Sequence, residues 1–170
     1  MAKATIHNRV VSEPKIMIDS LACCQSINSK VIIMITASIV PEQERLNFYP
    51  SITQQFVFLE NSIYRFSKEF LKEYHGAYWE FVTLDNGGKF AYPVMNTQVT
   101  LDNPHNYSSG SFSQEAAGMC IWLIALSFCA IVAFEKGDFA EMENFSYHQV
   151  RLMEYAREHS EWDNIARVID

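Results

Sequence analysis

The sequence predicts an α+β fold: a single compact domain in which a small antiparallel sheet packs against several helices. Two observations predict this architecture. Residues 78–95 contain two β-rich arms around a glycine-containing turn, and residues 114–136 form a long apolar stretch that predicts a central helix. The chain has 170 residues, of which 49% are hydrophobic and 14% aromatic, so one core can be filled without a cofactor.

The N-terminal part divides into an extension and the beginning of the domain. Residues 1–30 show no clear period, and we expect a loosely ordered extension ahead of a domain that covers residues 31–170. Residues 29–40, SKVIIMITASIV, are rich in β-branched side chains and predict a strand or a buried extended segment. Residues 41–50, PEQERLNFYP, begin and end with proline and predict a helical turn.

An amphipathic helix and then the hairpin follow. Residues 59–74 predict a helix, and Gly76 stands where a C-terminal glycine belongs. The apolar face of this helix consists of Leu59, Ile63, Phe66, Phe70, Leu71 and Tyr74. In the hairpin, Asp85–Gly88 has the residue types of a tight turn. Pro93 lacks an amide donor, which favours the edge of the sheet for the second arm.

The segments after the hairpin predict one more strand, a loop and the apolar helix. Residues 98–101 predict a third strand of the sheet, and residues 103–111, NPHNYSSGS, have the composition of a loop. Ser113 is the expected N-cap of the apolar helix. Lys136 and Gly137 are expected to end it.

Two further helices complete the predicted fold. Asp138 together with Glu141 marks the beginning of a helix over residues 139–159. Ser160 together with Asp163 then begins a short terminal helix.

The apolar run AAGMCIWLIALSFCAIVAF, residues 116–134, is uncharged and long enough to cross a membrane. Its flanks carry no positive bias and no tyrosine, and Trp122 lies well inside the run, unlike an interfacial anchor. The neighbouring segments each have an apolar face that needs a partner. We therefore expect a buried core helix and no membrane, with Gly118 allowing a neighbouring element to approach closely.

Acidic residues gather near the C-terminal end. The net charge is −7, and residues 135–170 contribute nine acidic and four basic side chains, a net −5. This charge disfavours a non-specific binder of nucleic acid, and the sparse carboxylates disfavour imitation of DNA. The acidic helices are a candidate contact face for a protein partner, and a merely solvated face is the alternative. The candidate residues of this face are Asp138, Glu141, Glu154, Glu158 and Asp163.

No catalytic or metal-binding motif stands out. The sequence contains no phosphate-binding glycine motif, no serine-hydrolase elbow and no zinc-protease signature. The histidines are scattered, and His148 is interpreted as solvated. The cysteines have no zinc-like spacing and are interpreted as buried or idle thiols, with Cys120 and Cys129 on opposite helix faces. We expect no catalytic residues, no metal and no cofactor.

Several short motifs resemble the ArdB/KlcA antirestriction family. The central motif is YHGAYWEF, residues 74–81, followed by LDNGG at 84–88 and Tyr92–Pro93. Upstream, residues 35–41, ITASIVP, and residues 45–50, RLNFYP, are similar to that family's N-terminal block. Glu115–Gly118 at the entry to the apolar helix is similar to its C-terminal half. The resemblance covers about residues 31–170. It departs from the family at Ala77, where a second glycine is common, and over the first 30 residues.

The resemblance implies a function and a set of candidate residues. It implies a small cytoplasmic protein of plasmids, prophages or other mobile elements that relieves restriction of incoming DNA by type I restriction-modification systems, without catalytic activity of its own. The candidate interaction residues from the motifs are Tyr74, Gly76, Trp79, Phe81, Asp85, Asn86, Gly87, Gly88 and Pro93. They are either a partner surface or the structural skeleton of the hairpin.

Three hypotheses of function follow. In the first, the protein contacts a type I restriction-modification enzyme or an associated host factor, without stable nucleic-acid binding. In the second, Asp85 and His105 belong to a hydrolase that acts on nucleic acid or a nucleotide. In the third, the protein is a plasmid-encoded DNA-binding regulator, which its net charge disfavours. The oligomeric state stays open.

Overall fold

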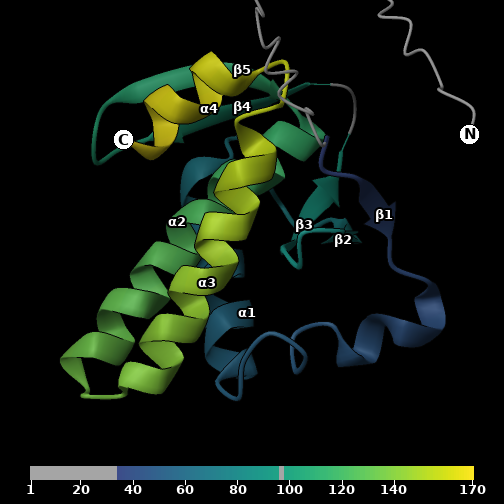
Figure 1. Ribbon diagram of the computed structural model, residues 1–170. Helices are drawn as coiled ribbons and strands as arrows, with labels where there is room; N and C mark the ends of the chain where they lie inside the picture. Colours follow the sequence, from purple (N-terminus) through teal and green to yellow (C-terminus); the bar gives the residue numbers. More distant parts are fainter. Residues whose placement is uncertain (1–33, 96–97) are drawn as a thin grey trace, which may run out of the picture. The chain divides into compact units, whose positions relative to one another are not determined.

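The computed structural model describes residues 34–95 and 98–170, so the predicted N-terminal extension over residues 1–30 lies outside the described residues. The described chain forms two antiparallel sheets packed with helices (Figure 1). The predicted α+β architecture, with a small antiparallel sheet and an apolar central helix, is confirmed.

The first sheet contains the predicted hairpin. Its strands, in spatial order, are β1 (Ala37–Ile39), β2 (Tyr78–Leu84) and β3 (Lys89–Val94). The turn between β2 and β3 is closed by the Leu84 amide, which donates to the Gly88 carbonyl at 2.9 Å. Gly87 in this turn has φ of +90°, a left-handed conformation that favours glycine. Pro93 lies opposite Trp79 on β3, an edge strand, as predicted.

The second sheet corrects two predictions. It consists of β4 (Gln98–Asn103) and β5 (Ser108–Ser113). The strand that begins at Gln98 therefore pairs with β5 and does not extend the hairpin, whose third strand is β1. The loop predicted over residues 103–111 is also wrong, because its second half is β5. Ser109 and Ser111 of β5 are exposed, while Phe112 is fully buried opposite Val99. Because Phe112 is the only large apolar residue of β5, the sequence shows no alternating apolar pattern that would predict a strand.

The first helix ends earlier than its hydrophobic pattern suggested. The N-terminal elements are the short 3₁₀ helix η1 (Glu42–Asn47) and α1 (Phe56–Phe70). Leu71 turns into an extended conformation because it bridges to Leu101 of β4, and the Lys72 amide donates to the Thr100 carbonyl at 3.1 Å. Gly76, with φ of +101°, thus lies in the link to β2 and does not cap the helix. Helix α1 ends where Leu71 pairs with β4, and a pairing with a strand so distant in sequence cannot be predicted from the local hydrophobic pattern.

The central helix α2 (Gln114–Glu135) is buried on most sides. The Ser113 side chain accepts a hydrogen bond from the Ala116 amide, so the predicted N-cap is confirmed. By length and composition, α2 is the one helix of the described chain able to cross a membrane, and 67% of its most apolar window is buried inside the protein. Because α1, α3, α4 and both sheets cover it, α2 is the core helix that the sequence predicted (Figure 1).

The remaining helices are α3 (Phe139–Ala156) and α4 (Trp162–Ile169). Gly137, with φ of +75°, turns the chain so that α3 lies beside α2 (Figure 1). Asp138 caps α3 by accepting from the Glu141 amide at 3.2 Å, as predicted. Glu161 precedes α4 as its N-cap residue, one position later than the predicted Ser160.

Gly118 fixes how closely α2 packs on the hairpin. A Cβ atom at this position would lie 2.4 Å from Cβ of Tyr92 and 2.8 Å from the Ala91 carbonyl oxygen, both on β3. These separations are far below van der Waals contact. The predicted close approach of a neighbouring element at Gly118 is therefore confirmed.

The interpretation of His148 as a solvated side chain is wrong. The residue is 7% exposed on α3, and its Nδ1 atom has no hydrogen-bond partner among the described residues. Burial, with a smaller contribution from the positive charge of Lys89, lowers the pKa of His148 to about 4. The protein thus holds His148 in its neutral form.

Replacing Gly118 with alanine should destabilise the protein. Alanine favours a helix over glycine by about 1 kcal/mol, but its methyl group would collide with β3, and overpacking of this kind costs about 1–3 kcal/mol. We expect a net loss in the free energy of unfolding, measured by urea denaturation. Ser127→Ala, in the same helix but at a half-buried position, serves as the control and should be nearly neutral. A Gly118→Ala protein more stable than the parent would contradict the close contact.

His148 should make the protein lose stability as the solution is acidified. The unfolded histidine binds a proton near its ordinary pKa of 6.5, whereas the folded one resists protonation down to about 4. The unfolded state therefore binds more protons between these values, and the free energy of unfolding falls as pH drops through that window. In His148→Phe the decrease between pH 7 and pH 5 should be smaller, while His75→Gln, at an exposed histidine, should keep it. An unchanged decrease in His148→Phe would refute this assignment.

Candidate functional site

The turn of the hairpin is fastened to α3 by Asn86. Its Nδ2 atom donates to the Arg151 carbonyl at 2.9 Å and to Oε2 of Glu154 at 3.0 Å, and its Oδ1 atom accepts from the Gly88 amide at 2.9 Å. The Asn86 side chain thus forms hydrogen bonds with the backbone of its own turn and with the helix α3 that covers the turn. Among the motif residues, Asn86 has the most extensive contacts with a distant element.

The two glycines of the turn leave room for α3. A Cβ atom on Gly87 would lie 2.7 Å from the Tyr147 hydroxyl oxygen. One on Gly88 would lie 3.1 Å from Cβ of Arg151. At Gly88 the contact is with a Cβ atom next to the helix backbone, so a larger residue would need the turn to shift. At Gly87 the contact is with the end of the movable Tyr147 side chain, and the left-handed φ of +90° is what favours glycine.

The aromatic motif residues of β2 lie on the face of the hairpin that packs against other aromatic side chains. Trp79 is buried, and its indole nitrogen donates to the Tyr74 hydroxyl at 3.2 Å. Phe81 is half-buried against Phe48, with ring centroids 4.8 Å apart. Pro93 is buried as well. These side chains fill space between the sheet and the aromatic core and present little area to a partner.

Gly76, Asp85 and Gly87 are the motif residues that are exposed to solvent. An added Cβ at Gly76 would meet nothing within 4 Å, so only its left-handed backbone favours glycine there. The Asp85 carboxylate makes no hydrogen bond with any side chain or amide in the described ranges. The nine motif residues thus divide into a packed or partly packed group of six and these three exposed positions.

The candidate acidic residues are distributed along α3 and α4 and lie close to other segments. Asp138 accepts from Nε2 of Gln55 at 2.9 Å. Glu141 accepts from the Thr53 hydroxyl, and Glu158 accepts from the Ile35 amide at 3.2 Å.

Glu154 and Asp163 complete this set. Glu154 binds Asn86, as described, and pairs with Arg151 at 3.1 Å. Asp163 is exposed in the first turn of α4. Four of the five carboxylates therefore hold distant or neighbouring parts of the same chain, and Asp163 alone among them projects freely into solvent.

The two residues of the hydrolase hypothesis lie in different parts of the fold. Asp85 is in the β2–β3 turn, whereas His105 is in the β4–β5 turn, where Nε2 lies 3.4 Å from Oε1 of Glu69. His105 lines a cavity that Asp85 does not reach. In the described part of the chain, no group of three histidine, cysteine or carboxylate side chains is placed to hold a metal ion.

The buried thiols are unreactive. Cys120 and Cys129 are both fully buried in α2, as the sequence predicted, whereas Cys23 and Cys24 lie outside the described residues. Burial raises the pKa of Cys129 to about 11 and that of Cys120 further still. Neither sulfur is a thiolate near neutral pH, so neither can act as a nucleophile.

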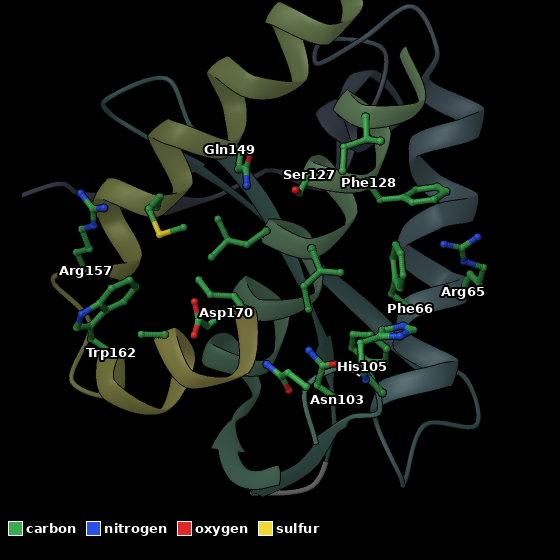
Figure 2. Close-up of a pocket in the computed structure, with 18 residues that line it drawn as sticks. Arg65, Phe66, Asn103, His105, Ser127, Phe128, Gln149, Arg157, Trp162 and Asp170 are labelled. Atoms are coloured by element: carbon green, nitrogen blue, oxygen red, sulfur yellow. Dashed lines mark hydrogen bonds between the residues drawn. The ribbon is translucent and has the colours of Figure 1, made fainter. Parts of the chain in front are cut away.

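A groove between the helices was not predicted from the sequence. We call it the interhelical groove; it has a volume of about 760 Å³ and lies among α1, α2, α3, α4 and the β4–β5 turn (Figure 2). Ile124, Phe128 and Ile131 of α2 form its apolar centre. The size and mainly apolar lining are typical of ligand-binding sites. No local pattern in the sequence indicates this groove, because α2 is apolar on all sides.

Arginines stand on opposite sides of the interhelical groove (Figure 2). The guanidinium of Arg65 lies 4.4 Å from the ring centroids of Phe66 and Phe128. Arg157 is exposed at the C-terminal end of α3. Within residues 34–95 and 98–170, neither guanidinium forms an ion pair. The groove therefore combines an apolar centre with two guanidinium groups that form no ion pair in the described chain and one carboxylate, that of Asp170.

Comparisons with known proteins agree on one family. The family model described as "Antirestriction protein" matches residues 72–170. The Escherichia coli K12 protein YafX, itself uncharacterized, is 35% identical over 141 residues, which cover 80% of this chain and 88% of YafX. The Escherichia coli antirestriction protein KlcA is 31% identical over 138 residues, which cover 80% of this chain and 95% of KlcA.

A solved structure from a study of KlcA and ArdB is similar in fold. It matches with a TM-score of 0.72 and 29% identity, over 80% of this chain and 95% of that one. KlcA and ArdB are described there as having a novel fold and antirestriction activity against type I DNA restriction systems in vivo but not in vitro.

Replacing Asn86 should loosen the hairpin from α3. Asn86→Ala removes three hydrogen bonds and leaves the Arg151 carbonyl without its side-chain donor, a change that costs about 1–3 kcal/mol. The free energy of unfolding should fall by this amount in chemical denaturation. Asp85→Ala, in the same turn but without such contacts, is the matched control and should be within about 0.5 kcal/mol of the parent. Equal stability of the two variants would argue against a structural role for Asn86.

Proposed function

The chain belongs to the antirestriction protein family, and from this premise we propose that it relieves type I restriction of incoming DNA by contacting proteins and not by imitating DNA. The observation that carries the proposal is the fold: 80% of the chain matches a solved structure from the KlcA and ArdB study. Type I systems are the restriction systems on which those proteins act in vivo.

The placement of the carboxylates supports protein contact over DNA mimicry. Double-stranded DNA presents one negative charge per about 1.7 Å of its axis, so a mimic needs closely spaced, free carboxylates. Here Asp138, Glu141, Glu154 and Glu158 accept hydrogen bonds from their own chain. Their charges support the fold and are not available as a row. The net charge of −7 also disfavours stable binding to nucleic acid.

We further propose that the protein acts in the cytoplasm and has no catalytic activity of its own. The separation of Asp85 from His105 and the high thiol pKa values support a binding role. Activity of the relatives in vivo but not in vitro favours a contact that needs a cellular factor, because a direct inhibitor would also act on the purified enzyme. The partner is thus a type I restriction-modification enzyme together with a host factor, or that factor alone.

Expression of the protein should protect unmodified phage on a host with a type I system. The efficiency of plating should rise towards that on a restriction-deficient host, while modified phage plate equally with or without the protein. Asp85→Ala should protect as the parent does, because its carboxylate has no structural or catalytic role in this account. No rise in plating, with soluble protein demonstrated by immunoblotting, would refute the proposed function. Loss of protection in Asp85→Ala at normal protein levels would indicate either a partner contact or a hydrolase site at the hairpin turn.

A further inference from the structure

The interhelical groove exposes one stripe of the core helix. Among the interior positions of α2, those left partly open are Ile124, Ser127, Phe128 and Ile131, together with Val132. The first four follow the i, i+3, i+4, i+7 spacing of a single helix face. Ile131, which lies four residues before the C-terminal end of α2, the chain's most apolar helix, is 56% exposed. One face of α2 is therefore partly exposed along part of its length, and the spacing of its side chains suits packing against another helix.

We propose that the interhelical groove binds an acidic amphipathic helical segment of a partner protein. The apolar side chains of the segment contact Ile124, Phe128 and Ile131, and its carboxylates bind Arg65 and Arg157. This inference rests on the proposed function, since it names the chemistry of the partner that an antirestriction protein of this family contacts.

Charge complementarity selects an acidic segment. The chain has 20 acidic and 13 basic residues, yet the groove presents guanidinium groups on opposite sides that pair with no carboxylate in the described ranges. By contrast, Arg45 pairs with Glu80 at 3.0 Å and Arg151 pairs with Glu154. An ion pair formed beside an apolar surface is partly shielded from water, which strengthens it.

The position of Arg65 suits a carboxylate in particular. Its guanidinium lies over the ring of Phe128, at the edge of the apolar stripe, so cation–π contact restrains the side chain. A planar guanidinium held in this way keeps its N–H edge available for two parallel hydrogen bonds to a carboxylate. An incoming apolar side chain on Phe128 would place a neighbouring carboxylate within reach.

Asp170 adds a second constraint on the partner. Figure 2 shows its side chain between Trp162 and Asn103, in the half of the view that holds Arg157 and away from Arg65. A negative charge there repels a carboxylate in the lower part of the groove and accepts from a donor such as an amide or hydroxyl. The segment therefore carries its carboxylates at the two flanks, near the arginines, and a donor between them.

A direct test uses a synthetic helical peptide of about 15 residues, with leucines at the i, i+3, i+4, i+7 spacing and glutamates on both flanks. The full-length protein, labelled with ¹⁵N, is titrated with this peptide and with a version in which glutamine replaces glutamate. We expect the glutamate peptide to cause saturable shifts of the Trp162 indole N–H signal. The glutamine peptide should bind much more weakly. No shift at Trp162, or equal binding of both peptides, would overturn the proposal.

Charge reversal assigns the contact to the groove. Arg65→Glu and Arg157→Glu should each weaken peptide binding by about tenfold or more. Lys68→Glu changes the same charge on α1 at an exposed residue that does not line the groove, and should bind within about twofold of the parent. Equal weakening by all three variants would show non-specific attraction and overturn the proposal. If the unsubstituted protein is a dimer and Arg65→Glu makes it a monomer, a second copy of the chain fills the groove. That result would also overturn the proposal.

Plating assays separate this inference from the proposed function. If the Arg65→Glu, Arg157→Glu double variant folds, binds no peptide and fails to protect phage, both are supported. If it binds no peptide but protects fully, the groove is not the antirestriction contact: the inference is overturned and the proposed function stands. If the parent itself gives no protection while the peptide binds, the proposed function fails and only the binding chemistry of the groove remains.

Discussion

The close contact between α2 and β3 is the constraint on which the rest of the fold depends. Gly118 brings the helix backbone against Ala91 and Tyr92, at a distance that no side chain with a Cβ atom would allow. From that contact onward α2 runs through the molecule, and the other elements cover its apolar surface. A helix that is apolar on all sides is stable in water only when surrounded in this way, so its composition requires the arrangement of the other elements.

The family motifs serve this arrangement more than they serve a surface. Asn86, Gly87 and Gly88 fasten the hairpin turn to α3, and Trp79 and Phe81 fill the space beneath the sheet. Contacts of this kind stabilise the fold whatever the partner. A contact surface then lies where side chains are exposed and unpaired, and the interhelical groove meets both conditions. The resemblance thus identifies what the protein is, while the groove supplies a hypothesis of how it binds.

Local signals predicted the elements well, and distant pairings explain the errors. The caps Ser113 and Asp138 and the glycine-containing turn could be read directly because each depends on neighbours in sequence. The strand over Ser108–Ser113 was missed because its serines face solvent and its pairing partner defines it. The end of α1 was misplaced because Leu71 bridges to Leu101. The interhelical groove could not be predicted, because Arg65 and Arg157 line one groove only after four helices have packed.

The central claim is that the protein acts through a contact at the interhelical groove and not at the hairpin turn. Site-specific photo-crosslinking in restricting cells during phage challenge tests it most directly. A crosslinking amino acid at Ile131 should capture a restriction enzyme subunit or host factor, attached through an acidic amphipathic segment identified by mass spectrometry, whereas one at Asp85 should not. Capture of that protein from Asp85, and none from Ile131 at equal expression, would contradict the account.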